Sequence, residues 1–234
     1  MNSGVPCKAD LLGDHGIRVV WVDPHLIVLD KPTGLLSVPG KGPDGMNCLS
    51  THVQCVWPDA LVVHRLDMST SGLMVMARGA DMQRALSAAF ARRLTRKRYE
   101  AVVWGNPEAA ARTASSLPAD GWHTIDRPLV VDWPNRPRSK ICQDTGKPSL
   151  TRWRTLQTES CTGHTRLELE PVTGRSHQLR VHLMSIGHPI LGDNLYAHAD
   201  ALAAAPRLLL HAKALQLPHP ATGTDMSWES QPAF

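Results

Sequence analysis

The chain has 234 residues, of which 42% are hydrophobic and 20% charged, values that are ordinary for a globular protein able to bury a full core. Its formal net charge of +4 permits a polyanionic partner, and no apolar run approaches the ~20 residues of a membrane span, so we expect no membrane attachment. Five cysteines form no CxxC pair and the N-terminus has no long apolar segment, so we expect neither a disulfide framework nor a signal peptide, and a cytoplasmic location.

The start of the chain predicts an arm followed by two strands. Residues 1–16 are polar and contain glycine, which is typical of a flexible arm. Residues 17–22 and 25–29 are β-like runs, IRVVWV and HLIVL, joined by an Asp-Pro turn signal. The glycine-rich segment after them is no Walker phosphate loop, because five residues rather than four separate Gly34 from Gly40.

Two helices and a further strand are expected between residues 46 and 104, outside the stretch 62–78 that is described below. Residues 46–56 form a short helix in this prediction, with Cys48 and Cys55 seven apart on one face. Residues 80–94 show apolar residues at helical spacing among several arginines, and each arginine taken singly is typical of a solvated face. The tract TRKRY then leads into a strand over residues 99–104 and places an aromatic ring beside a dense positive patch.

The second half indicates further strands and one helix. We expect a surface connection over residues 105–126 and an irregular segment over 127–147, since both are rich in Pro, Gly and small or polar residues. The strand-like runs that follow are residues 151–158, 165–170, 208–217 and 226–229, and a helix over 176–186 interrupts them after a plausible Ser176 cap. Many strands with few helices predict an α+β fold built on a mixed, largely antiparallel sheet.

One stretch, VVHRLDMSTSGLMVMAR over residues 62–78, carries unusual chemistry. Asp67 stands between two apolar runs and next to Arg65, and a carboxylate is seldom buried unless it is paired or hydrogen-bonded. An Asp can also cap a Ser/Thr turn, and this stretch alone leaves both interpretations open.

Other catalytic and metal-binding patterns fit poorly. His177 and His182 are five apart, about 140° around a helix, whereas a helical zinc pair is four apart on one face. We therefore expect no metal and interpret these histidines as oriented or hydrogen-bonded side chains. The HRLD sequence lacks the HRD spacing, glycine-rich loop and DFG of a kinase, and no GxSxG nucleophile elbow is present. What remains is an anionic nucleophile at Asp67, cationic partners at Arg65 and Arg180, and an aromatic platform at Tyr99.

This combination resembles the RluA family of RNA pseudouridine synthases. The matching segments are residues 30–34 (DKPTG), 64–67 (HRLD) with 71–72 (SG), 97–99 (KRY), 174–182 (GRSHQLRVH) and 187–193 (GHPILGD), in the order that the family has them. Residues 35–40 (LLSVPG), 132–137 (DWPNRP) and 206–212 (PRLLLHA) are most similar to the family member that acts on both 23S rRNA and tRNA.

The resemblance implies one catalytic domain over residues 17–234, without the S4 RNA-binding domain of many relatives, and a central active-site cleft. It implies the isomerisation of a uridine to pseudouridine in stem-loops, namely a hairpin loop of 23S rRNA and position 32 of tRNA anticodon loops. It implies no cofactor and no metal, and we expect a monomer. A family member with a single rRNA or tRNA target, a non-catalytic RNA-binding module and a glycosidase are the alternatives; a glycosidase would need a second carboxylate as the acid.

The resemblance also implies roles for individual residues. Asp67 would be the nucleophile, attacking the ribose C1′ or the uracil ring, Arg180 would pair with it, and Tyr99 would stack on the target base. Arg65 would occupy the space left by the flipped uridine. The remaining residues expected to contact RNA are His64, Arg96, Lys97, Arg98, Arg175 and His177.

Overall fold

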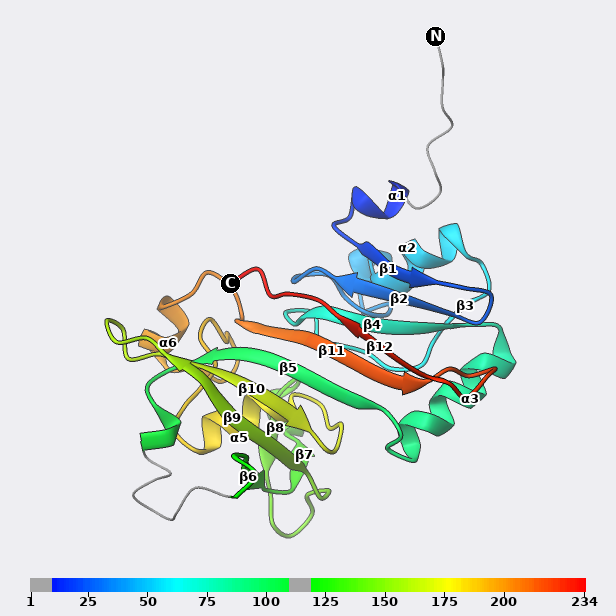
Figure 1. The fold of residues 1–234 in the computed structure, drawn as a ribbon. Coiled ribbons are helices and arrows are strands. Elements are labelled where there is room, and N and C mark those ends of the chain that lie inside the picture. Colours follow the sequence, from blue (N-terminus) through cyan, green and yellow to red (C-terminus); the bar gives the residue numbers. More distant parts are fainter. Residues whose placement is uncertain (1–9, 110–118) are drawn as a thin grey trace. The chain divides into compact units, whose positions relative to one another are not determined.

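The structure is a computed structural model that describes residues 10–109 and 119–234, and it divides into two compact units (Figure 1). Unit 1 consists of the chain up to Arg96 together with Ala212–Ala233, and unit 2 consists of Lys97–His211 with Phe234. Residues 1–9 of the expected arm lie outside the described residues. Its end is ordered, because Asp10–Gly13 form the short helix α1 and the Leu12 side chain is only 1% exposed.

Unit 1 is built on antiparallel strands that follow the sequence prediction closely. The strands are β1 (Arg18–Val22), β2 (Leu26–Lys31), β3 (Ala60–Val62), β4 (Ser71–Arg78), β11 (Leu210–Pro218, most of it in this unit) and β12 (Asp225–Glu229). They lie in the order β1-β2-β4-β11, while β3 also pairs with β4 and β12 with β11. The registers β1–β2, β2–β4, β3–β4 and β11–β12 are all antiparallel, as predicted.

The helices of unit 1 depart from the prediction mainly at their ends. Helix α3 (Ala80–Ala91) packs Leu86 into a core cluster with β4, and it stops before the expected residue 94 because Arg93 adopts a left-handed φ of 58°. A 3₁₀ turn, η1 (Pro43–Met46), precedes helix α2 (Leu49–Val56). The expectation that Cys48 and Cys55 share a helix face is wrong, since Cys48 is the buried N-cap and Cys55 is exposed.

Unit 2 contains a second set of antiparallel strands with helices packed against it. The strands β5 (Arg96–Val103), β6 (His123–Asp126), β9 (Leu150–Thr158) and β10 (Thr165–Pro171) lie in the order β5-β10-β9-β6. Burial alternates along β10, whose Leu167 and Leu169 join a core cluster with Leu179 and Leu183 of helix α5 (Gln178–Ser185). The strand β6 and a short helix, α6 (Ala199–Ala203), were not predicted.

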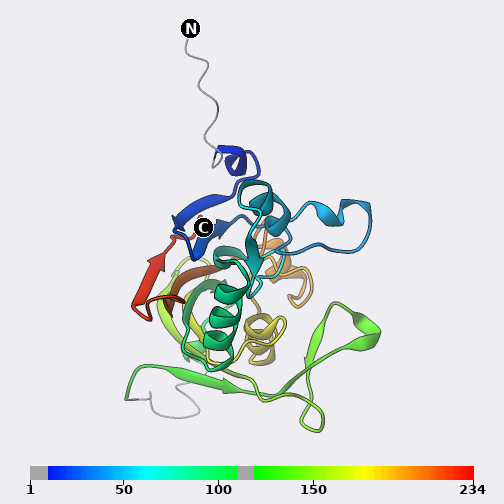
Figure 2. The same ribbon diagram turned by 90° about the vertical axis from the view of Figure 1, so that its right-hand side faces the viewer.

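The segment expected to be irregular contains a hairpin. Strands β7 (Leu129–Val131) and β8 (Ser139–Ile141) pair with each other and flank the 3₁₀ turn η2 (Trp133–Asn135). Figure 2 shows this hairpin in light green, extending away from the other strands of its unit. Strands of three residues between prolines carry too little periodicity to be found in the sequence. None of the helices among the described residues is long and apolar enough to cross a membrane.

Candidate active site

Asp67 lies half-buried in the loop between β3 and β4, where the apolar runs on both sides become strands. Its main-chain carbonyl accepts a hydrogen bond from the Thr70 amide at 3.1 Å, which closes the turn. Gly72, at the start of β4, has a φ of 111°, and a Cβ there would lie 2.4 Å from the Ala212 carbonyl oxygen. Only glycine permits this close approach of two backbones, so the Ser-Gly pair of the sequence motif positions the end of the Asp67 loop.

A buried lysine supports the same loop. Lys31 is 0% exposed, and its Nζ donates to the carbonyls of Pro32 (2.8 Å), Leu35 (2.8 Å) and Met68 (3.1 Å), which matches the three N–H groups of an ammonium. Burial lowers the pKa of Lys31 to about 7, while the negative charge of Asp67 acts in the opposite direction. A buried cation beside Asp67 was not among the predicted site residues, although Lys31 stands in the DKPTG motif.

Two hydroxyl groups of the segment after Lys31 hold the loop from its other side. Ser37 Oγ donates to the Leu66 carbonyl at 2.7 Å and accepts from the Leu66 amide at 3.1 Å. Thr33 Oγ1 donates to the Ser69 carbonyl at 2.8 Å. These bonds flank Asp67 by one residue and by two, so residues 31–37 define the backbone on which the carboxylate stands.

The two other predicted residues of the HRLD motif differ in their surroundings. Arg65 is exposed. The ring of His64 stacks on Phe90 with centroids 4.7 Å apart, and its Nε2 accepts a hydrogen bond from the Val75 amide at 3.1 Å. His64 therefore packs the loop against α3 and β4, and a contact with RNA remains a prediction.

Strand β5 carries the basic tract and Tyr99, and all of this strand except Arg96 belongs to unit 2. Arg96 is exposed, whereas Lys97 is half-buried and burial lowers its pKa. The Arg98 guanidinium lies 3.2 Å from Glu170 and 4.4 Å from the Trp122 ring centroid, so it has partners within the fold. Tyr99 is half-buried and packs against the core cluster of this unit.

Helix α5 places Arg180 in the interior of unit 2. Its Nε and Nη2 donate to the two carboxylate oxygens of Asp193 at 2.8 and 2.6 Å, and the two side chains are 3% and 0% exposed. Asp193 also accepts from the amides of Leu195 and Tyr196. Such a buried, bidentate pair is rigid, and removing one partner typically costs ~3–5 kcal/mol. Asp193 was missed as a site residue, although it ends the GHPILGD motif.

The loop before α5 is held by a tyrosine. His177 adopts a left-handed φ of 56°, so it is the N-cap in place of the expected Ser176, and its Nδ1 lies 2.7 Å from the Tyr196 hydroxyl. The same hydroxyl accepts from the Ser139 amide at 2.7 Å. Arg175 is exposed, and its amide donates to Gln178 at 3.1 Å.

His182 is held by hydrogen bonds within the fold, as was predicted from the sequence. It is buried, with Nδ1 2.9 Å from Thr151 Oγ1 and Nε2 2.9 Å from the Arg127 carbonyl. Since the carbonyl oxygen accepts only, Nε2 carries the proton and Thr151 donates to Nδ1. Burial lowers the pKa of His182, which favours this neutral ring.

One group of potential metal ligands lies in unit 1, made of Asp23, His25 and His219. His219 Nδ1 accepts from the amides of Ala221 and Thr222, so Nε2 of the neutral ring carries the proton and faces Asp23 at 3.3 Å. A metal would need the lone pair of that nitrogen. The arrangement is that of a histidine–aspartate pair.

Comparison with known proteins identifies the class. Residues 25–185 match the family model described as RNA pseudouridylate synthase. The fold agrees, since the structure resembles human RNA pseudouridylate synthase domain containing 1 with a TM-score of 0.72 at 24% identity, over 94% of this chain and 85% of that one. Human RNA pseudouridylate synthase domain containing 4 gives a TM-score of 0.70 at 23% identity, over 96% and 90% of the two chains. The chain belongs to the RNA pseudouridylate synthase family, and the enzymatic class is that of an isomerase acting on RNA.

Within this family, the chain is similar over most of its length to synthases described as dual-specificity. The chain is 44% identical over 216 residues to the dual-specificity RNA pseudouridine synthase RluA of Escherichia coli K12, covering 92% of this chain and 93% of that protein. It is 45% identical over 216 residues to the protein of the same name from Yersinia pestis, covering 92% and 99%. The similarity thus extends over nearly the full length of both relatives.

Proposed function

We propose that this protein converts a uridine to pseudouridine in two kinds of RNA, a hairpin loop of 23S rRNA and position 32 of tRNA anticodon loops. The observation that carries the proposal is 44–45% identity over 92% of the chain to synthases described as dual-specificity. The expected setting is the cytoplasm, and the expected form is a monomer acting on isolated stem-loops.

The chemistry requires one bond to break and another to form. The N1–C1′ bond of uridine is cleaved, the uracil rotates, and a C5–C1′ bond replaces it while the C5 proton is lost and N1 gains one. Substrate and product are isomers, so the proposed reaction consumes no water and needs no redox partner.

We assign the nucleophile to Asp67, which attacks either the ribose C1′ or the uracil ring. The support is its position on a backbone fixed by Ser37 and Thr33, and the neighbouring Lys31, whose ammonium form, populated near and below pH 7, interacts electrostatically with it. A nearby cation favours the ionised, nucleophilic carboxylate. In this proposal Arg180, itself oriented by Asp193, is the second cation that holds Asp67 ionised.

Tyr99 and Arg65 are assigned to the base. Tyr99 stacks on the flipped uracil, and Arg65 fills the space that the uracil leaves. Extruding a base costs a few kcal/mol and least where the base is already unpaired, which favours loops as substrates. Arg96, Lys97 and Arg175 add phosphate contacts that are independent of sequence.

The test uses both isolated stem-loops and matched RNAs in which the target uridine is replaced by cytidine. Nucleoside analysis by mass spectrometry should show one pseudouridine per loop, none in the cytidine RNAs, and no free uracil. Conversion of only one loop would refute dual specificity. Release of free uracil would indicate a glycosidase, and tight binding without any product would indicate a non-catalytic RNA-binding protein.

A further inference from the structure

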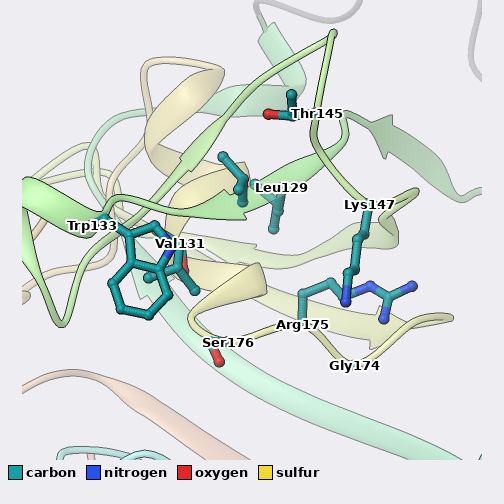
Figure 3. Close-up of a pocket in the computed structure, with 10 residues that line it drawn as sticks. Leu129, Val131, Trp133, Thr145, Lys147, Gly174, Arg175 and Ser176 are labelled. Atoms are coloured by element: carbon teal, nitrogen blue, oxygen red, sulfur yellow. The ribbon is translucent and has the colours of Figure 1, made fainter.

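A pocket of about 310 Å³ lies in unit 2, between the β7–β8 hairpin and the loop that precedes α5 (Figure 3). We call it the Trp133 pocket. Its walls are formed by Leu129, Val130, Val131, Trp133, Ser139, Thr145, Lys147, Gly174, Arg175 and Ser176. This volume is at the lower end of the range of ligand sites, about 300–1,000 Å³, and is suited to one small ligand.

The two sides of the Trp133 pocket differ in chemistry. Figure 3 shows the Trp133 ring beside Val131, with Lys147 and Arg175 next to each other on the opposite side. Trp133 is 66% exposed and Val131 38% exposed, so both present apolar surface to solvent. The lining residues include two cations and no carboxylate. The pocket therefore combines a flat aromatic surface with a site for an anion.

The walls are held in place by bonds within unit 2. Lys147 and Leu129 exchange two main-chain hydrogen bonds of 2.8 and 3.0 Å. The Ser139 amide is fixed by the Tyr196 hydroxyl, and the Arg136 guanidinium lies 4.5 Å from the Trp133 ring centroid. A preformed pocket binds its ligand at a smaller entropic cost than a loop that must first become ordered.

The neighbouring charges add to the cationic side. A Cβ placed on Gly174 would lie 3.8 Å from Lys97 Nζ, so the basic tract of β5 reaches this loop. Two acidic residues, Asp132 and Asp144, are next to lining residues in the sequence. Asp132 is paired with Lys140 at 3.2 Å and accepts from Asn135 at 2.9 Å. The pocket thus favours an anionic ligand.

We propose that the Trp133 pocket binds one unpaired nucleotide of the substrate RNA, distinct from the uridine that is isomerised. The base would stack on Trp133 and its phosphate would contact Lys147 and Arg175, the combination by which proteins bind single-stranded RNA. The target uridine itself is a poor occupant, because the pocket contains no carboxylate to act as nucleophile. This inference rests on the proposed function, and it adds a second base-binding site that helps to select the RNA loop.

The pocket is tested by RNA binding, which needs no turnover. Fluorescence anisotropy is measured with labelled stem-loops in which each loop nucleotide in turn is made abasic. Trp133→Ala should weaken binding of the intact loop about tenfold, because the base loses the ring on which it stacks, whereas Trp133→Phe should retain most of the affinity. At one loop position other than the target, removing the base should weaken binding to the wild-type protein about tenfold relative to the intact loop. On that same abasic RNA, Trp133→Ala should cause no further loss of affinity.

The matched controls are Trp21→Ala, which removes an exposed ring from unit 1, and Lys41→Gln; neither should alter binding. Lys147→Gln should reduce the slope of log K against log salt by about one. Wild-type affinity in Trp133→Ala, or an equal loss on every abasic RNA, overturns the inference. If wild type forms pseudouridine and the pocket variants bind RNA normally, the pocket inference is refuted but the proposed function is not. If binding depends on one loop position as expected but no pseudouridine forms, the proposed function is refuted but the pocket inference is not.

Discussion

Asp67 is the residue on which the proposed chemistry depends, and its surroundings are more elaborate than its sequence motif. The carboxylate stands in a turn whose backbone is bonded on both sides by Thr33 and Ser37. Catalytic groups must be held in place by residues that are themselves fixed. The DKPTG and LLS segments, which the sequence offers only as family markers, are the residues that do so.

The first prediction concerns Asp67→Asn. This change keeps the shape of the side chain but removes the anionic nucleophile, so pseudouridine formation should fall below detection. Binding of the stem-loop RNA should stay within a few-fold of wild type, because phosphate contacts are unaffected. Single-turnover assays with excess enzyme provide the measurement. A rate one-tenth that of wild type would remove Asp67 from the role of nucleophile.

The second prediction concerns Lys31 and pH. In the unfolded chain a lysine titrates near 10.4, whereas burial lowers the pKa of Lys31 in the folded protein to about 7. Between these values the unfolded state binds more protons, so the free energy of unfolding should rise with pH, and the stabilisation should be lost as pH falls toward 7. Between these two pKa values, Lys31 should raise the free energy of unfolding by up to ~1.4 kcal/mol for each pH unit.

Urea unfolding of wild type and Lys31→Met at pH 6.5 to 9.5 isolates this contribution. The substitution also removes three hydrogen bonds to carbonyls, so Lys31→Met should be less stable throughout. The informative quantity is the difference between the two proteins, which should grow with pH. A difference that is constant across the range would show that Lys31 stays charged in the folded protein.

At the level of elements, one hydroxyl forms hydrogen bonds to both the β7–β8 hairpin and the start of helix α5, which also pack together through Leu129, Ile141 and Val181. Tyr196 bonds to the Ser139 amide in β8 and to the His177 ring before α5. Burial raises the pKa of Tyr196, so the hydroxyl remains protonated and able to donate. Tyr196 therefore contributes to the position of two segments that line the Trp133 pocket.

The third prediction is that Tyr196→Phe loosens this hairpin without unfolding the protein. The buried Ser139 amide would lose its acceptor, which costs ~1–3 kcal/mol. Amide hydrogen exchange should become faster in β7 and β8, while the exchange of β9 and β10 should be unchanged. The KM for RNA should rise more than kcat falls. Unchanged exchange at Ser139 would show that another group takes over the bond.

For the whole molecule, we expect phosphate contacts to supply a part of the affinity for RNA that does not depend on sequence. The net charge of +4 is modest, but the predicted phosphate contacts cluster around the basic tract of β5 and the loop before α5. Each neutralised phosphate releases condensed counterions, so affinity falls linearly with salt on a logarithmic scale.

The fourth prediction follows for Arg96, an exposed residue at the start of β5. Arg96→Gln should weaken binding equally for both stem-loops and reduce the magnitude of the salt slope by about 0.7–0.9. Arg84→Gln is the control, because Arg84 is exposed on α3 and paired with Asp81. A loss on one RNA only would mean that Arg96 reads a base or a shape instead of a phosphate.

The sequence by itself determined the class of chemistry and most of the fold. An Asp between apolar runs, a basic tract before an aromatic residue, and alternating strands are local patterns, so β2, β4, β9 and β10 and the α+β class were all predicted. Asp67 and the family motifs can be recognised in the sequence without knowledge of any tertiary contact.

Only the tertiary structure decided how the site is supported. Lys31 reaches the carbonyl of Met68, Arg180 binds Asp193, and Tyr196 bonds to Ser139, each across a gap in sequence that propensity and periodicity cannot span. The β7–β8 hairpin was missed for the same reason, since its three-residue strands are stabilised by partners elsewhere in the chain and not by their own pattern. Local patterns specify which residues can do chemistry, whereas burial and long-range hydrogen bonds determine which groups hold them in place.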